Sequence, residues 1–312
     1  NPDEDLDALV ASFNALDYPD KELVLAVGGA HRACDYARLA RNGVRIIEHP
    51  GGGKQRALAA CLEQASGSIV YLTAADCRFD STAFRALVQP IATGAETVTT
   101  GGDRPPRSQG RSSFVALQAS PAAYHLARTP DYTTGLLGRN CAVSRASLES
   151  SGGFATEALT GTDYVLAKQL EAAGCRIRSV RESRVESLYP TRVSAYLRQQ
   201  ARWLRNLVLH GLRYRRYGEV RASLQSSVIG LGMLLLTLSL PLTRTGGVRL
   251  LALPLLHGYL SRLRYLDFAA RTGVIERRLA PYLLALPQMY VDFVAWARPL
   301  LEYPSTARRY RW

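Results

Sequence analysis

The sequence predicts an α/β fold: a mostly parallel sheet with helices on both faces, followed by C-terminal amphipathic and transmembrane helices. Apolar runs of strand length alternate with helical patterns over residues 1–190, as in sheets that are covered on both faces. After Pro190 the chain becomes a long basic helix, and an uncharged stretch at 223–242 is long enough to cross a bilayer core. With 312 residues and 47% hydrophobic composition, the chain suffices for one large domain and an appendage.

The elements of the first region follow from the spacing of apolar residues. Over residues 3–16, five apolar side chains fall on one face of a predicted helix: Leu6, Leu9, Val10, Phe13 and Leu16. The next elements are predicted as strands at 22–27, 44–49, 68–73 and 96–101, with helices at 51–65 and 82–92. Because ligands bind beyond the carboxyl ends of the strands in such sheets, Asp76 is a candidate site residue.

The net positive charge of the chain comes entirely from its C-terminal part. Residues 1–175 hold 16 Lys and Arg against 19 Asp and Glu, a formal charge of −3, whereas 176–312 hold 23 Arg against 7 acids, a charge of +16. Such asymmetry indicates either nucleic acid or an anionic membrane surface. The arginines flank apolar segments and no nucleic-acid recognition motif is present, so the sequence favours a membrane and predicts no nucleic acid partner.

The five cysteines carry little chemistry of their own. They are odd in number, and no two of them are spaced Cys-x-x-Cys. The sequence therefore predicts neither a disulfide framework nor a zinc site, and it favours a reducing compartment.

The second region divides into an interfacial helix and a membrane part. Residues 191–222 are predicted to form a basic interfacial helix, and 223–242 a membrane span rather than a buried core helix, because they are uncharged. The segments at 248–260 and 279–301 are either weaker spans or interfacial helices. By the positive-inside tendency the arginine-rich stretches that flank the first two segments are cytoplasmic, so these two segments form a hairpin.

Three short stretches carry candidate chemistry. Asp76 ends "YLTAAD", Asp163 opens the helix of "GTDYVLAKQLEAAG", and "QQARW" contains Gln199, Arg202 and Trp203. Each stretch also has a simpler interpretation: a loop acid, a first-turn acid favoured by the helix dipole, and one face of an interfacial helix. "GGGK", which ends at Lys54, lacks the GxxxxGK[ST] spacing of a phosphate-binding loop.

Taken in this order, the stretches resemble the inverting, membrane-associated glycosyltransferases of the GT-A (Rossmann-like) fold that carry a QxxRW motif. That family includes the synthases of cellulose, chitin and hyaluronan and the ceramide glucosyltransferases. "GGGKQRALAACLEQASGSIVYLTAADC" is similar to its Gly-Lys stretch and Asp-x-Asp motif, and "GRNCAVSRASLESSGGF" to its acceptor-side strand. The resemblance covers residues 1 to about 242 and implies a GT-A-like domain at 1–190, with a membrane region at 223–312.

The resemblance implies a role for each candidate residue. Asp163 matches the base that deprotonates the acceptor hydroxyl. Asp76 matches a ligand of the diphosphate and of Mg²⁺ or Mn²⁺, a hard cation that prefers carboxylate oxygen. Lys54, Gln199, Arg202 and Trp203 match positions that bind the nucleotide-sugar: a guanidinium fits phosphate oxygens, and the indole offers a flat wall to a sugar ring.

The implied function is transfer of a sugar from a nucleotide-sugar donor to the hydroxyl of a lipid or saccharide acceptor. The resemblance places the enzyme in the plasma or inner membrane, with its catalytic domain in the cytoplasm. The alternative is a catalytically silent relative that serves as a structural or binding subunit of a membrane complex.

The sequence departs from the family's pattern in three ways. Two of these departures motivate the silent alternative, and the third concerns the fold. Ala74 stands where the Asp-x-Asp motif has its first acid, and the residues Ala26 to Gly29 stand where the family has Asp-Asp-Gly. The family's first strand precedes the helix at 3–16 and is absent here, so neighbouring strand edges are expected to be unpaired. We therefore expect that the natural protein has upstream residues that carry this strand.

Overall fold

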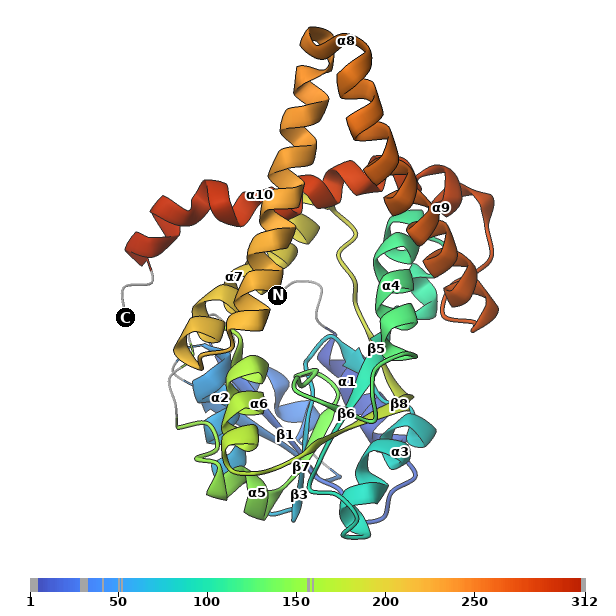
Figure 1. The fold of residues 1–312 in the computed structure, drawn as a ribbon. Helices are drawn as coiled ribbons and strands as arrows, with labels where there is room; N and C mark the ends of the chain where they lie inside the picture. Colours follow the sequence, from blue (N-terminus) through green and yellow to red (C-terminus); the bar gives the residue numbers. More distant parts are fainter. Residues whose placement is uncertain are drawn as a thin grey trace. The chain divides into compact units, whose positions relative to one another are not determined.

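The computed structural model describes residues 5–28, 33–40, 42–49, 51, 53–155, 158 and 160–309, with the backbone alone at 241–250 and 302–309. It divides into two compact units (Figure 1): the first comprises Asn1–Arg104 and His125–Leu188, and the second Pro105–Tyr124 and Tyr189–Trp312. The predicted change from an α/β region to a basic helix after residue 190 lies close to a boundary between the units, which falls after Leu188. Some residues of the sequence predictions lie outside the described residues: Gly29 and the start of the helix predicted at 3–16.

The elements at the start of the first unit follow the predicted order. They are α1 (Leu6–Asn14), β1 (Leu23–Gly28), η1 (Ala33–Leu39), β2 (Val44–His49), α2 (Lys54–Gln64) and β3 (Ile69–Leu72). Helix α1 begins where Asp5 accepts a hydrogen bond from the Ala8 backbone N–H at 3.0 Å, an N-cap that satisfies one free donor of the first turn. Each of the elements predicted between residues 3 and 73 is present within a few residues of its expected bounds.

The remaining elements of the first unit complete the main sheet. They are β4 (Cys77–Arg78), α3 (Ser81–Ala92), β5 (Val98–Arg104), β6 (Tyr132–Thr133), β7 (Cys141–Ser144), α5 (Arg145–Ser150), α6 (Thr162–Ala172) and β8 (Ile177–Ser187). The main sheet has the order β3-β7-β5-β8-β4, with β6 also paired to β8.

The prediction of a mostly parallel sheet was wrong, because the main sheet is mixed. Strand β5 runs parallel to β8, but β7 is antiparallel to both of its neighbours, and β4 and β6 are antiparallel to β8. Strands β1 and β2 form a separate parallel pair. An apolar run indicates that a strand exists. The direction of that strand depends on how the connection before it crosses the sheet, and the spacing of apolar residues carries no information about that connection.

Helices cover both faces of the main sheet, as predicted. Ala142 and Val143 are neighbours in β7, and their side chains point to opposite faces. Val143 belongs to a buried cluster with residues of α5 and α6, which include Leu148, Leu166 and Leu170. Ala142 belongs to a second cluster with Leu87, Val88 and Ile91 of α3. The sheet is therefore a central layer between two helical layers.

A cavity of about 1200 Å³ lies between the two sheets. All residues of β1 and β3 line it, and so do Asp5, Leu6 and Asp7 at the start of α1. Within the described residues, β1 pairs with β2 alone and β3 with β7 alone, so each strand has one edge without a partner strand. The unpaired strand edges expected from the sequence are thus present, and they border one cavity.

The second unit is helical. It contains η2 (Arg107–Gln109), most of α4 (Ser113–Leu126), α7 (Val193–Arg213), α8 (Tyr217–Arg271), α9 (Leu279–Leu283) and α10 (Ala285–Arg309). The sequence did not predict that residues 105–124 belong here. They do so because Ala116, Leu117 and Ala119 of α4 share a buried cluster with Leu266 and Ala269 of α8.

Helix α8 folds back on itself, which agrees with the predicted hairpin (Figure 1). A Cβ on Gly230 would lie 2.7 Å from the Phe293 carbonyl oxygen, and a Cβ on Gly258 2.5 Å from the Met289 side chain. A straight helix would separate the two glycines by about 42 Å, whereas Met289 and Phe293 lie about 6 Å apart along α10. Both arms of α8 can reach α10 only if the chain reverses between them.

A buried polar network joins three helices of the second unit. Asp292 of α10 is 2% exposed; it accepts a 2.5 Å hydrogen bond from the Tyr196 hydroxyl of α7 and pairs with Arg262 of α8. The Gln288 side-chain amide donates a further hydrogen bond to Asp292 at 3.1 Å. Because a buried carboxylate is costly unless it is paired, this network specifies how α7, α8 and α10 pack.

Candidate active site

Three consecutive residues, Gly138, Arg139 and Asn140, lie at the centre of the candidate site, just before β7. Asn140 is 1% exposed, and its side-chain amide donates hydrogen bonds to the Gly102 carbonyl at 2.8 Å and to the Ser183 carbonyl at 3.2 Å. Its carbonyl oxygen accepts a bond from the Tyr71 hydroxyl at 2.8 Å. Asn140 therefore ties β3, β5 and β8 together and fixes the position of the two residues before it.

Gly138 brings two of the predicted site residues together. The Lys54 ammonium, at the start of α2, donates a hydrogen bond to the Gly138 carbonyl at 3.3 Å. On the other side, a Cβ on Gly138 would lie 2.7 Å from the Asp163 Cβ and 3.2 Å from its Oδ2. The absence of a side chain at residue 138 thus lets the carboxyl group of Asp163 approach the backbone.

Asp163 is held in the first turn of α6. The turn before it uses Gly161, whose φ of 70° favours glycine, and the Tyr164 backbone N–H donates to the Asp163 Oδ1 at 3.0 Å. Burial raises the pKa of the Cys141 thiol to about 12, the Asp163 carboxylate acts in the same direction, and Lys54 opposes it. Lys54 and Asp163 therefore both influence the pKa of Cys141, the first residue of β7.

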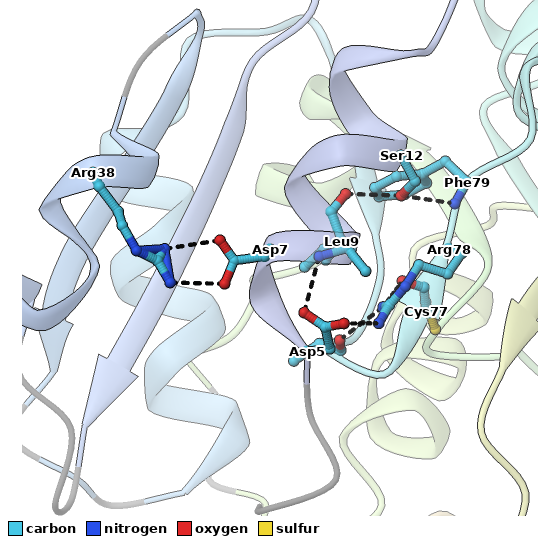
Figure 2. A network of polar contacts seen from close by, with 10 residues as sticks. Asp5, Asp7, Leu9, Ser12, Arg38, Cys77, Arg78 and Phe79 are labelled. Atoms are coloured by element: carbon cyan, nitrogen blue, oxygen red, sulfur yellow. Dashed lines mark hydrogen bonds and ion pairs between the residues drawn. The ribbon is translucent and has the colours of Figure 1, made fainter.

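Asp76 lies between β3 and β4. The short strand β4 pairs with β8 at Cys77 and Ser187, and the Leu188 backbone N–H approaches the Asp76 carbonyl at 3.4 Å. Figure 2 shows how α1 holds the residues that follow: the Phe79 backbone N–H donates to the Ser12 hydroxyl at 3.2 Å, and Arg78 lies 3.9 Å from Asp5. These contacts fix the loop that carries Asp76.

Arg139 is a basic residue of the site that the sequence did not indicate. Its guanidinium donates to the Ser187 hydroxyl at 2.5 Å and lies 3.6 Å from the Asp103 carboxylate. Burial raises the pKa of the Cys77 thiol to about 12, Asp76 adds to this rise, and Arg139 counteracts it. Arg139 thus contacts Ser187 of β8, which pairs with Cys77 of β4, the residue after Asp76. The sequence resemblance covers the stretch that contains Arg139 but assigns no role to this residue, so only the contacts of the folded chain point to it.

The other three predicted residues lie in the second unit. Gln199, Arg202 and Trp203 belong to α7, where Arg202 is exposed and Trp203 is 43% exposed. The structure thus brings Lys54 and Asp163 together at Gly138 and places Asp76 in the loop before β4 of the same unit. It places Gln199, Arg202 and Trp203 together on one helix of the second unit.

The carboxylates of the site fit a divalent cation that is bound jointly with a substrate. Among the described residues, no group of three His, Cys, Asp and Glu side chains is arranged to hold a metal by itself. Mg²⁺ and related ions, however, are commonly held by one or two carboxylates together with substrate phosphates and water. The Asp76 carboxylate is an oxygen ligand of the type that such an ion takes.

The large cavity between the sheets is not centred on these residues. Of the predicted site residues only Lys54 lines it, together with residues 73–75 just before Asp76. The charged side chains that meet at Gly138, rather than this cavity, therefore mark the candidate site.

Residues 1–206 match the model of a family described as glycosyltransferase like family 2, which is more than half of the chain. The chain belongs to this family. Membership indicates a glycosyltransferase. No protein among the curated sequences matches the chain.

Solved structures resemble this family 2 chain at low identity. The mannosyltransferase PcManGT from Pyrobaculum calidifontis, solved with GDP-Man and Mn²⁺, is 19% identical over 95% of this chain and 83% of its own, with a TM-score of 0.56. That likeness supports the GT-A-like α/β fold. Glucosyl-3-phosphoglycerate synthase from Mycobacterium tuberculosis, solved with Mn²⁺, UDP-Glc and phosphoglyceric acid, is 20% identical over 61% of this chain and 69% of its own; its TM-score of 0.40 is too low to carry an argument.

Proposed function

We propose that this family 2 chain is a membrane-bound inverting glycosyltransferase that moves a sugar from a nucleotide-sugar to the hydroxyl of a lipid or saccharide acceptor. The observation that carries the proposal is the meeting of Lys54 and Asp163 at Gly138, the residue before Arg139. Arg139 in turn contacts Ser187, which pairs with Cys77, the residue after Asp76. A base, a carboxylate for a cation and basic groups for phosphate are what such a transfer needs.

Asp163 acts as the general base. The acceptor oxygen attacks C1 of the donor sugar, its proton passes to the Asp163 carboxylate, and the bond from C1 to the diphosphate breaks with its electron pair on the diphosphate oxygen. A single displacement of this kind inverts the configuration at C1. The contact between Asp163 and Gly138 supports the role, because a base must be held in one position relative to the proton that it accepts.

Asp76 is the proposed ligand of Mg²⁺ or Mn²⁺. When bound, such a cation neutralises the charge that develops on the departing diphosphate. Lys54 lies at the other side of Gly138, and its positively charged ammonium group is proposed to bind the nucleotide-sugar. Gln199, Arg202 and Trp203 are proposed to bind the same donor, since Arg202 fits phosphate oxygens and the exposed Trp203 ring offers a flat face to a sugar.

Membrane association is supported by the apolar surface of the second unit. One helix among the described residues is long and apolar enough to cross a membrane: Tyr217–Leu240, within which an 18-residue window has a mean hydropathy of 1.6. The exposed large hydrophobic side chains of the described residues all lie at or beyond Val193, and the most exposed are Leu238 (75%) and Leu253 (74%), one on each arm of the α8 hairpin. An apolar surface of this kind is costly in water and is typical of a membrane-facing helix.

The arginines near the hairpin support a cytoplasmic catalytic domain at the plasma or inner membrane. Arg213, Arg215 and Arg216 precede its first arm, Arg271 ends its second arm, and Arg277 and Arg278 follow. A catalytically silent subunit of a membrane complex remains the alternative, which the acids missing at Ala74 and at Ala26 to Gly28 motivate.

The test is a screen of nucleotide-sugars with the protein in membranes or detergent, with product analysis. The proposal predicts transfer that requires a divalent cation and is lost in Asp163→Asn. Asp17→Asn is the matched control, because Asp17 is exposed and its carboxylate pairs with Arg85 at the surface. Transfer that survives unchanged in Asp163→Asn contradicts the proposed base, and the absence of any nucleotide-sugar activity or binding favours the silent subunit.

A further inference from the structure

Two segments of the second unit that are far apart in the sequence meet at its surface: residues 105–112 and 272–279. The Arg278 guanidinium donates a hydrogen bond to the Arg111 carbonyl at 2.5 Å, across 167 positions of the sequence. A Cβ on Gly110 would lie 3.8 Å from a carboxylate oxygen of Glu276. The two segments are therefore neighbours in the fold.

Both segments are held in place by their own packing. Val274 and Ile275 are buried in one cluster with Ala116 of α4. The Gln109 side chain exchanges two hydrogen bonds with the backbone of Tyr189, one to its carbonyl and one from its N–H, each at 2.9 Å. The surface that the two segments form is thus fixed by buried contacts on both sides.

That surface carries a concentrated positive charge. The two segments hold one acid, Glu276, and four exposed arginines, a formal charge of 4 − 1 = +3: Arg107, Arg111, Arg277 and Arg278. We call these four residues the arginine patch. Within the part of the chain that the structure describes, none of them forms an ion pair. Like charges gathered in this way repel one another, and an anionic partner would relieve that repulsion.

The surroundings of the arginine patch favour a lipid partner. Exposed leucines precede it on the second arm of α8, at Leu256 and Leu260, and follow it at Leu283 and Leu284 of α9 and its C-cap. A nucleic acid offers phosphates to arginines but no apolar phase to leucines. The surface of an anionic membrane offers both, and mixed basic and apolar surfaces are typical of membrane interfaces.

We propose that the arginine patch binds the headgroups of anionic phospholipids beside the α8 hairpin. The inference rests on the membrane association in the proposed function and deepens it by naming the class of lipid. Arg277 and Arg278 follow the hairpin directly in the sequence. Arg107 and Arg111 join them only in the fold, from the segment that connects β5 to α4. Their contribution is therefore what separates this proposal from the general excess of arginine near the hairpin.

Flotation with two kinds of vesicle tests the proposal: phosphatidylcholine alone, and phosphatidylcholine with about 30% phosphatidylglycerol. The variant Arg107→Gln with Arg111→Gln leaves the backbone carbonyl that Arg278 contacts in place. Each arginine near an anionic surface contributes roughly fivefold in affinity. We expect the double variant to bind the anionic vesicles about 10- to 30-fold more weakly and the neutral vesicles within about 3-fold of wild type. Lysine at both positions keeps the charge and should keep binding within about 3-fold.

Arg38→Gln with Arg85→Gln is the matched control. It removes the same charge from the first unit, at two arginines whose side chains are 60% and 50% exposed. Each pairs with an exposed aspartate, so its loss should cost little stability. We expect this variant to keep the wild-type preference for anionic vesicles.

The salt dependence of the wild-type protein is a second measurement that needs no variant. Its preference for anionic vesicles should fall as the salt concentration rises from about 0.05 to 0.5 M. The inference is overturned if that preference is independent of salt, or if Arg107→Gln with Arg111→Gln binds anionic vesicles like wild type. It is also overturned if the double variant loses affinity for duplex DNA and not for vesicles. If the wild type floats with neither kind of vesicle, the membrane association in the proposed function is itself wrong.

Discussion

Gly138 and Asp163 are in such close contact that only a glycine fits at residue 138: an added Cβ would lie 2.7 Å from the Asp163 Cβ. The same glycine accepts a hydrogen bond from Lys54 at its carbonyl. Gly138 therefore constrains the positions of both Asp163, the proposed base, and Lys54, which is proposed to bind the donor. These two residues come from helices more than 100 residues apart in the sequence.

Gly138→Ala should displace Asp163 without removing it. We expect kcat to fall about 10- to 100-fold, because a misplacement of about 1 Å can cost about 100-fold in rate. We also expect the free energy of unfolding to fall by about 1–3 kcal/mol. Transfer assays and urea unfolding check both values. Gly135→Ala is the control in the same loop, since a Cβ there meets nothing within 4 Å. Full activity in Gly138→Ala contradicts the proposed arrangement.

Glu22 should make part of the stability depend on pH. Its Oε1 accepts hydrogen bonds from the Ser66 backbone at 2.5 Å, the Ser66 hydroxyl at 2.9 Å and the Gly67 backbone at 2.9 Å. Burial acts to raise the pKa of Glu22, but these hydrogen bonds and Arg45 outweigh it and lower that pKa below its usual value. A lowered pKa in the folded state gives stability that is present above the unfolded-state pKa and is lost as pH falls through the folded one.

Urea unfolding of wild type and Glu22→Gln at several pH values tests this linkage. At pH 7 we expect the variant to be less stable by about 1 kcal/mol, a modest value because the carboxylate is partly exposed to solvent. The difference should shrink as the pH falls below about 4.3. A difference that stays constant from pH 7 to pH 3 would show that the charge of Glu22 does not contribute.

The α8 hairpin should lose its affinity for a membrane when charge is placed on its exposed arms. In Leu238→Lys with Leu253→Lys, we expect vesicle binding to fall by about 10-fold or more, since each lysine is costly in hydrocarbon. Leu279→Lys is the control, because Leu279 is 71% exposed and lies outside the hairpin. Flotation with anionic vesicles measures the effect. If the double variant floats like wild type, the hairpin is not the membrane-binding element.

The cavity between β1 and β3 should accept an added β-strand. An extension of alternating β-branched and polar residues, joined ahead of Asn1 by a short linker, can pair with the open edges of both strands. We expect a higher thermal unfolding midpoint, because each new buried hydrogen bond contributes about 1 kcal/mol. The same extension with prolines at alternate positions cannot donate to the ladder and should have no effect. An unchanged midpoint with the first extension contradicts an open slot.

The sequence could predict where the elements lie, because apolar runs and helical spacing report burial directly. Strand β3 and helix α6 were found in this way, and with them Asp76 and Asp163. The antiparallel direction of β7 could not be predicted, since it depends on the path of the chain through residues 105–140. Nor could the sequence predict that residues 105–124 pack with the helices of the second unit.

The same limit applies to the site. Asp76 and Asp163 were recognisable because an acid after a strand and an acid at the start of a helix are local patterns. Asn140 and Arg139 were not, because their partners are Gly102, Ser183, Ser187 and Asp103, which the sheet brings close from 36 to 48 residues away. Buried hydrogen bonds between distant residues leave no periodic signal in a sequence.

The most direct test of the central claim separates chemistry from binding at Asp163. With the sugar donor identified, kcat and the donor Kd are measured side by side for wild type and Asp163→Asn. A general base predicts a kcat about 100- to 10,000-fold lower in the variant with a donor Kd within about 3-fold of wild type. A kcat that stays within about 3-fold of wild type would contradict the assignment of Asp163 as the base.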